Sequence, residues 1–249
     1  QIRFTLQKGA SAGNLLHDLL ELNDFSAPDW NENGAELAVR FGLEASRTDD
    51  LYNWLDEVLA TPLGTKQAPS HLTLSDLSLP QTLREAEFYF PMNESKWSEL
   101  KHILFEHRKS VAKQLALDNS GESATILSIS EPIPAEPVPS LMMSALEGMM
   151  HGFIDLIFTY EGKYYVADYK STWLGDSVSH YMPQALNANN QHHLYDLQYL
   201  IYCLALHRYL KNAIVDYTPE AHFGGVYYLY LRGMHPSNTN GEGVFFTPI

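Results

Sequence analysis

The stretch of sequence that decides the fold is EGMMHGFIDLIFTYEGKYYVADYKSTWLG, residues 147–175. It contains two runs rich in aromatic and β-branched residues, 153–160 and 164–169, on either side of Glu161, Gly162 and Lys163. Strand-forming runs that flank a short turn with glycine are typical of a β-hairpin. If Glu161 and Gly162 form a two-residue turn, Tyr160 pairs with Lys163 and the register of the hairpin is fixed.

This register places Asp155 opposite Asp168. Opposed side chains share one face with their Cβ atoms about 5 Å apart, and the strand period of two adds Lys170 to that face. Because two facing carboxylates repel each other, the pair calls for a cation between them. Oxygen ligands suit Mg²⁺ or Mn²⁺, and the ammonium of Lys170 could stabilise developing negative charge. The alternative is a surface hairpin with solvated charges, but the apolar flanks from Phe153 to Phe158 predict burial on both faces.

Composition bounds the class of protein. With 249 residues, 45% of them hydrophobic, the chain can bury a sizeable core. A lone cysteine, Cys203, excludes a disulfide framework and fits a reducing compartment. No apolar stretch approaches the roughly 20 residues of a membrane span, so no membrane partner is expected. The chain begins with Gln1 rather than Met, which predicts a fragment of a longer protein.

The charge balance limits how the chain can bind nucleic acid. A net charge of −14 argues against binding through a basic surface, and it predicts that other domains or partners deliver any nucleic-acid substrate. No Walker A pattern occurs, so no ATP site is expected.

The N-terminal half is mostly helical by pattern. Residues 10–22 predict an amphipathic helix capped by Ser11 or Asn14, with His17 beside its apolar stripe. A lone histidine in such a place is more often a packing or surface residue than a ligand. Two helical pieces are expected within 29–60 and a helix with a solvated basic face at 97–117. A strand at 83–91 puts Glu85 and Glu87 on one face, where they either point to water or supply an acid to the cluster.

The C-terminal half begins after a proline-rich connector at 118–140. Trp173, just past the hairpin, either lines a substrate groove or caps the core. One long helix is expected at 187–210, in which Gln198 and Tyr202 share a face and the buried glutamine needs a partner. Cys203 in that helix is expected to be a core residue. Residues 223–231 predict a buried strand, and 244–246 a short final one.

Several segments, taken in order, resemble one known family. They are Gly152-Phe153-Ile154-Asp155-Leu156, Asp168-Tyr169-Lys170-Ser171, Tyr195-Asp196-Leu197-Gln198-Tyr199 through Tyr202, and His222-Phe223-Gly224-Gly225-Val226. The chain resembles the C-terminal nuclease domains of the RecB family, of the PD-(D/E)XK restriction-endonuclease-like superfamily, over essentially all its residues. The resemblance implies an α/β fold, in which a mixed central β-sheet is flanked by helices and an N-terminal helical region is added.

The resemblance also implies a domain organisation. Residues 1–249 would form a single nuclease domain of a longer helicase–nuclease. Its parts would be an N-terminal helical part with the first core helix and strand (1–117), the connector (118–140) and the catalytic core (141–249).

The family's site residues carry over position by position. His17, Asp155 and Asp168 match the metal-binding residues, and Lys170 matches the catalytic lysine. Gln198 and Tyr202 match a Gln-x-x-x-Tyr motif that supports the lysine or contacts DNA. The remaining catalytic acid corresponds to Glu85 or Glu87, and the family's spacing favours Glu85.

The implied activity is Mg²⁺-dependent hydrolysis of single-stranded DNA by an exodeoxyribonuclease V type enzyme, in double-strand-break repair and recombination. Mn²⁺ could replace Mg²⁺, and Ca²⁺ could bind without supporting turnover. The implied partners are DNA delivered by a helicase, the RecC and RecD subunits and the RecA recombinase, in the bacterial cytoplasm. Two alternatives stay open: a module that mainly recruits RecA, and a structure-selective resolvase on the same fold.

Overall fold

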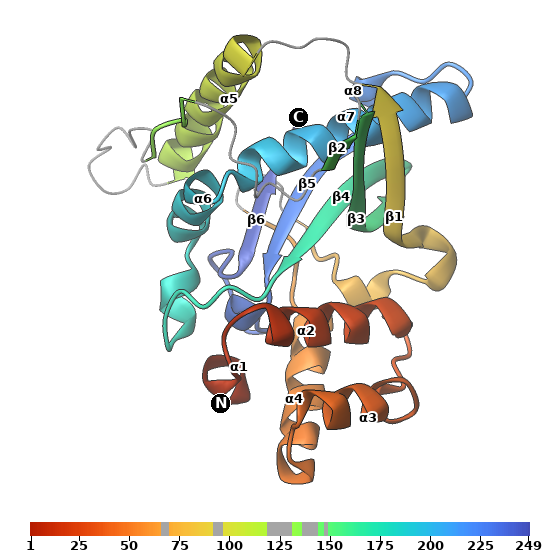
Figure 1. Cartoon of the computed structure of the whole chain (residues 1–249), viewed down its shortest axis with the longest axis vertical. Helices are drawn as coiled ribbons and strands as arrows, with labels where there is room; N and C mark the ends of the chain where they lie inside the picture. The colour runs from red at the N-terminus through yellow and green to blue at the C-terminus, as the bar shows by residue number, and fades with distance from the viewer. Residues whose placement is uncertain (66–69, 92–96, 119–130, 136–143, 147–148) are drawn as a thin grey trace.

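The structure, a computed structural model, describes residues 1–65, 70–91, 97–118, 131–135, 144–146 and 149–249. Its centre is a mixed β-sheet of order β1-β3-β4-β5-β6, with β2 paired to β3 off this path. The strands are β1 (Thr82–Pro91), β2 (Ser144–Leu146), β3 (Met149–Tyr160), β4 (Lys163–Lys170), β5 (Phe223–Tyr230) and β6 (Val244–Thr247). Helices lie on both sides of the sheet (Figure 1). The predicted α/β fold with a helix-flanked mixed sheet is therefore confirmed.

The hairpin of β3 and β4 has the predicted register. Glu161 and Gly162 have φ values of +49° and +78°, as a two-residue turn of the type favoured in hairpins requires. Opposed pairs run from Tyr160–Lys163 to Leu156–Ala167. The ladder ends there, one pair before the expected Asp155–Asp168 pair. The two aspartates thus follow the last ladder pair, and they do not form a ladder pair themselves.

The sheet divides at this point. Beyond Leu156, β3 keeps its antiparallel pairing with β1 and takes up β2 as its other neighbour. Strand β4 instead continues beside β5, in parallel, as far as the pair Lys170–Tyr230. Strands β3 and β4 thus separate after the pair Leu156–Ala167. Side chains of the residues that follow this pair can lie in the space between the two strands.

Four helices cover one face of the sheet. They are α1 (Ile2–Thr5), α2 (Ala10–Leu22), α3 (Trp30–Phe41) and α4 (Ala45–Leu59). Leu16 of α2 and Trp54 of α4 pack in one core with Leu156 and Tyr169 of the sheet. The predicted bounds of α2 are confirmed, but its N-cap is Gly9 without a side-chain hydrogen bond, so the expected caps Ser11 and Asn14 are wrong.

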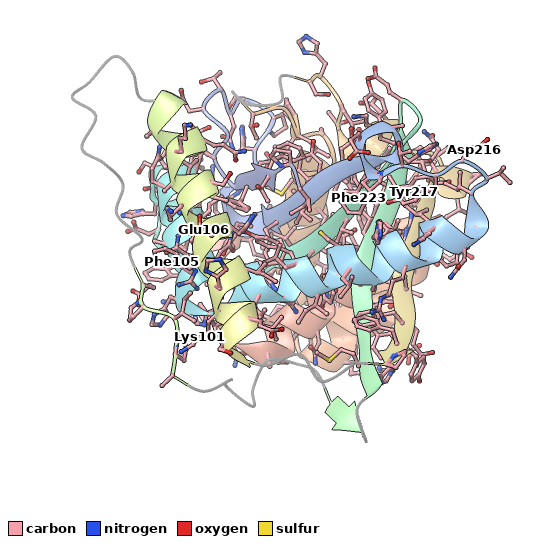
Figure 2. All side chains as sticks on the ribbon, turned by 90° about the horizontal axis from the view of Figure 1, so that it is seen from above. Lys101, Phe105, Glu106, Asp216, Tyr217 and Phe223 are labelled. Atoms are coloured by element: carbon pink, nitrogen blue, oxygen red, sulfur yellow. The ribbon has the colours of Figure 1, made fainter. Side chains whose placement is uncertain are left out.

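The other face is covered by α5 (Trp97–Asp118), α6 (Pro183–His192) and α7 (Tyr195–Ala213). In Figure 2, α5 lies beside the first turns of α7, and Asp216 and Tyr217 mark the far end of α7. The single helix expected at 187–210 is therefore two helices. Leu194 interrupts them with a left-handed φ of +55°.

The solvated basic face predicted for α5 is present only in part: His102, Lys109 and Lys113 are exposed, but other basic residues of the helix are not. Arg108 is buried and pairs with Asp196 of α7, and His107 lies 2.8 Å from the hydroxyl of Tyr199. These contacts fasten α5 to the start of α7.

The remaining expectations have mixed outcomes. Cys203 is buried, as predicted. Phe153, expected to be buried, is 46% exposed. The connector at 118–140 lies outside the described residues except for 131–135 and for Asp118, which is the last residue of α5, and the single-domain division stays a prediction. Among the described residues, no helix is both long and apolar enough to cross a bilayer.

Candidate metal centre and catalytic pocket

A pocket of about 770 Å³ opens where β3 and β4 separate, between α2 and α7. All seven residues proposed from sequence line it: His17, Glu85, Asp155, Asp168, Lys170, Gln198 and Tyr202. Trp173 also lines the pocket, with the ammonium of Lys8 3.3 Å from its ring centroid. This places Trp173 in the groove, one of the two positions expected for it.

Glu87, the alternative catalytic acid, is not among the residues that line the pocket. Its carboxylate lies against Tyr89 and His151 on the outer part of β1 and β3. The structure therefore brings the carboxylate of Glu85, and not that of Glu87, to the other proposed residues.

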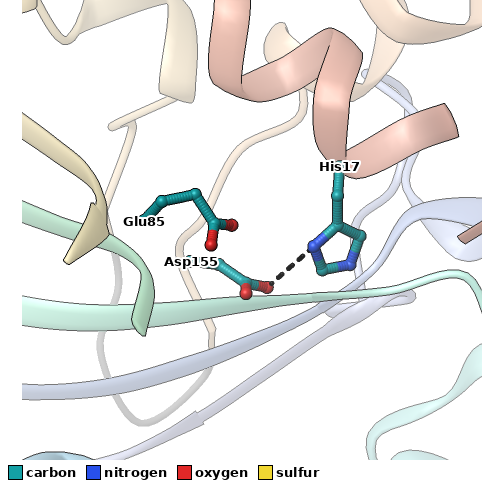
Figure 3. A group of neighbouring side chains, drawn as sticks. All are labelled: His17, Glu85 and Asp155. Atoms are coloured by element: carbon teal, nitrogen blue, oxygen red, sulfur yellow. Dashed lines mark ion pairs between the residues drawn. The ribbon is translucent and has the colours of Figure 1, made fainter. Parts of the chain in front are cut away.

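Three potential ligands converge in the pocket, as Figure 3 shows: His17 from α2, Glu85 from β1 and Asp155 from β3. One ligand atom from each lies within 4.8 Å of the others. Glu85 falls between the ladder residues Arg84 and Ala86 and has a left-handed φ of +48°. A non-glycine residue rarely adopts that conformation, which costs about 1–2 kcal/mol and turns the Glu85 side chain out of the regular strand pattern.

The imidazole of His17 is oriented by the backbone. Its Nε2 lies 3.0 Å from the carbonyl oxygen of Tyr169, which can only accept, so Nε2 carries a proton. Its Nδ1 faces the carboxylate of Asp155 at 3.4 Å. Burial lowers the pKa of His17, which disfavours a second proton on Nδ1. A neutral ring directs the Nδ1 lone pair at a carboxylate, an arrangement that a cation between them stabilises.

Both carboxyl groups are poor places for uncompensated charge, Asp155 more so than Glu85. The pKa of Asp155 is raised well above its usual value by burial and then by the negative charge of Asp168. The pKa of Glu85 is raised by burial and then by Glu21. One imidazole nitrogen with two carboxylates is a donor set that fits a divalent cation such as Mg²⁺ or Mn²⁺. The residues present therefore fit the implied metal.

Asp168 plays a different part in this arrangement. It is buried, and its Oδ2 lies 2.6 Å from the ammonium of Lys170, outside the cluster of His17, Glu85 and Asp155. Lys170 also lies 3.8 Å from the ring centroid of Tyr195 and 4.8 Å from that of Tyr228. A carboxylate and two aromatic faces all attract an ammonium ion, so these neighbours fix the position of the Lys170 ammonium.

Gln198 fixes the last side of this ammonium pocket. Its Oε1 accepts hydrogen bonds from Lys170 at 3.3 Å and from the hydroxyl of Tyr228 at 2.7 Å. Its Nε2 donates to the hydroxyl of Tyr202 at 2.9 Å. The predicted pairing of Gln198 with Tyr202 is thus present, and the buried amide has the partners that it needs.

Two parts of this network were not predicted from the sequence. One is the residue Tyr228 of β5, and the other is the contact between the ring of Tyr195 and Lys170. In the parallel register Asp168 pairs with Tyr228 and Lys170 with Tyr230. The run Val226-Tyr227-Tyr228-Leu229-Tyr230 marks a buried strand, but the sequence holds no signal for which tyrosine lies beside the lysine. That choice depends on the register between two distant strands.

The left-handed backbone conformation of Glu85 predicts how substitutions at this position change the free energy of unfolding. We expect Glu85→Gly to have a free energy of unfolding about 1 kcal/mol above that of Glu85→Ala, because only glycine adopts this φ without strain. Urea denaturation without metal measures the difference. At Glu87, whose φ is not positive, the order should reverse by about 0.5–1 kcal/mol. The same order at both positions would contradict the strained conformation.

The hydrogen bond from Tyr228 to Gln198 makes a second prediction. In a double-mutant cycle of Tyr228→Phe with Gln198→Leu, we expect a coupling energy of about 1 kcal/mol in the free energy of unfolding. Tyr227→Phe is the matched control, since the ring of Tyr227 packs in the core on the opposite face, and its coupling to Gln198 should be near zero. Equal coupling in both cycles would refute the specific bond.

Comparison with known proteins identifies relatives of this chain. No family model matches the chain. It is 39% identical over 243 residues to the RecBCD enzyme subunit RecB of Escherichia coli (strain K12) and 35% identical over 245 residues to that of Haemophilus influenzae. It is 32% identical over 248 residues to RecB of Mycobacterium tuberculosis. These alignments cover 96%, 97% and 92% of this chain but only 18%, 17% and 21% of the three relatives. The resemblance to the RecB family, inferred from ordered segments of the sequence, is therefore confirmed: the chain is homologous to a segment that spans about a fifth of the length of these RecB subunits.

Proposed function

We propose that the chain is a metal-dependent nuclease domain that hydrolyses phosphodiester bonds of single-stranded DNA. The observation that carries this proposal is the convergence of His17, Glu85 and Asp155 beside the ammonium of Lys170 in one pocket. Similarity to RecB supports a role within a RecBCD enzyme, in DNA repair and recombination.

The proposed chemistry divides between two groups of residues. His17, Glu85 and Asp155 would hold a divalent cation, which when bound lowers the pKa of water and polarises the phosphate. Asp168 borders the same pocket and, by the family resemblance, is proposed as a further metal ligand. Lys170 would orient the attacking water or stabilise the negative charge that develops on the phosphate oxygens.

The surroundings of Lys170 explain how it can serve this purpose. An ammonium whose neighbours are Asp168, Gln198 and two tyrosine rings has few other positions to occupy. Such preorganisation is the usual source of electrostatic stabilisation of a transition state, because no reorganisation is needed during the reaction. Tyr202 and Tyr228 act through Gln198 and are positioning residues.

Mg²⁺ as the cation in use, the partners RecC and RecD, and the recruitment of RecA are parts of this proposal that rest on the resemblance. So does the bacterial cytoplasm as the location. The described structure has no feature that favours RecA recruitment or junction resolution over strand cleavage.

The buried acids predict how pH and metal affect stability. The folded chain holds a proton on Asp155 at pH values where the unfolded chain has lost it, since the pKa is raised on folding. Without metal, the free energy of unfolding should therefore fall as pH rises above about 4. Mg²⁺ or Mn²⁺ should restore it, by about 1.4 kcal/mol at ten times its Kd, and more at about pH 8 than at about pH 6.

Asp155→Asn separates this effect from general stabilisation. The neutral amide can still accept from the N–H of Tyr169, but it should remove most of the fall in stability with pH and most of the gain from metal, and Glu85, whose pKa is also raised, should keep the remaining pH dependence. Asp50→Asn, on the exposed surface of α4, should keep both. Wild-type unfolding that is insensitive to both metals at either pH would contradict the metal centre.

The catalytic assignment is tested by cleavage of a labelled single-stranded oligonucleotide in Mg²⁺. We expect Asp168→Ala and Lys170→Ala each to lower the rate at least about 100-fold, the usual effect of removing a preorganised charged group. Lys163→Ala, at the other end of β4, should cleave like the wild type. Retained cleavage in both pocket variants would remove these residues from the mechanism, and faster cleavage of four-way junctions would favour the resolvase.

A further inference from the structure

Three aromatic rings lie together on the β1–β3 ladder, next to the pocket. Tyr89 pairs with His151 across the ladder, and their rings stack with centroids 4.2 Å apart and planes inclined by 8°. Phe153, two residues along β3, meets the ring of His151 nearly edge-on at 5.4 Å. We call Tyr89, His151 and Phe153 the aromatic strip.

Tyr89 and Phe153 are exposed and His151 is half-buried, and contacts with Glu87 orient the rings of Tyr89 and His151. Tyr89 is 61% exposed and Phe153 is 46% exposed. Glu87 accepts a hydrogen bond from the Tyr89 hydroxyl at 2.6 Å, and its carboxylate lies 2.9 Å from Nε2 of His151. Both contacts are made at ring edges, so Glu87 holds the two rings parallel without covering their outer faces. Large aromatic surfaces are normally buried, and rings held in water in this way are available to a flat ligand.

The aromatic strip is continuous with the pocket. Phe153 lines the pocket itself, and the opposed pairs Tyr89–His151 and Glu87–Phe153 precede the level of Glu85 and Asp155 on the same ladder. At about 3.3 Å per residue, Phe153 lies about 7 Å and His151 about 13 Å from Asp155 along β3. A ligand that extends from the reacting phosphate along this ladder therefore meets the rings.

Charge determines which part of such a ligand can bind here. The chain has a net charge of −14, and Asp18 and Glu21 add to the acids of the pocket. Phosphate groups thus gain little from this surface, because strong backbone binding needs clustered basic residues. Stacking of a base on an aromatic ring needs no basic surface and tolerates any sequence. In a duplex the base faces are already covered, so the surface fits unpaired bases.

We infer that the aromatic strip is a base-stacking subsite, which holds the unpaired bases that flank the reacting phosphate of single-stranded DNA. This inference rests on the proposed nuclease function and deepens it, since it accounts for selection of single strands by a chain with little basic surface. Glu87 is a positioning residue of the strip.

The test is binding of a fluorescent 12-nucleotide oligothymidylate in EDTA, which prevents cleavage, followed by anisotropy. An abasic strand of equal length and charge is the comparison. Tyr89→Ala and Phe153→Ala should each weaken binding of the oligothymidylate about 5- to 150-fold, the range for loss of one stacked base, and leave the abasic strand unaffected. In Mg²⁺ the same variants should raise KM for the oligothymidylate with kcat unchanged.

Two control variants isolate stacking. Tyr89→Phe keeps the ring and loses the bond to Glu87, and should retain most of the affinity. Tyr209→Ala removes a tyrosine of similar exposure, 66%, on α7 and should bind like the wild type. Equal weakening for both strands, or no weakening for either, would overturn the stacking subsite.

The outcomes also separate this inference from the proposed function. A wild-type chain that cleaves single strands, with strip variants that bind and cleave normally, would refute the strip and leave the nuclease standing. A wild-type chain that cleaves nothing, yet prefers bases over the abasic strand and loses that preference in Tyr89→Ala, would support the strip and refute the nuclease. Strip variants with normal DNA binding but impaired association with RecC and RecD would mark this surface as a protein interface instead.

Discussion

The site depends on the two backbone groups of one residue, Tyr169. Its N–H donates to Oδ2 of Asp155 at 2.8 Å, and its carbonyl oxygen accepts from Nε2 of His17 at 3.0 Å. The first bond occurs where β3 leaves β4, so the Asp155 carboxylate takes the place of a strand neighbour as a hydrogen-bond partner. The second aims Nδ1 of His17 at that same carboxylate. A single residue of β4 thereby orients two potential metal ligands, His17 and Asp155, which come from elements far apart in the sequence.

The face on which β3 buries its side chains changes at the same point. Leu156 and Phe158 pack in the core beneath α1–α4, whereas Ile154 packs with Ala86 in the core beneath α7. Successive even-numbered residues of a regular strand would share one face. The left-handed conformation of Glu85, on the neighbouring strand at the same level, accompanies this change. An irregularity shared by β1 and β3 thus turns two carboxylates toward the pocket, where a regular ladder would have kept the strand alternation.

How much of this was readable from the sequence depended on the range of the contacts. The hairpin register followed from a two-residue turn and a period of two, both local, and it was correct, although the ladder ends one pair before the two aspartates. His17 could not be found by spacing, because 152 residues separate it from its partner Tyr169, and only the family resemblance identified it. The choice of Glu85 over Glu87 required a φ angle, and the role of Tyr228 required the register of a parallel pair joined by a long crossover. The break at Leu194 was missed because no proline or glycine lies near it to mark the end of a helix.

The rigid ladder of β1 and β3 carries both the carboxylates of the metal site and the rings of the aromatic strip. From Leu156 onward the side chains of β3 pack in the core beneath the helices, and this packing fixes the position and direction of the strand. On the other side of Asp155 the same strands carry Tyr89 and Phe153 into solvent, and contacts with Glu87 orient the rings of Tyr89 and His151. Since both sides belong to one hydrogen-bonded pair of strands, the distance from the rings to the carboxylates is fixed by strand geometry. A flexible loop could not hold that spacing. Because the chain has few basic side chains to bind phosphates, it gains most from recognition of bases by aromatic rings at a fixed distance from the carboxylates.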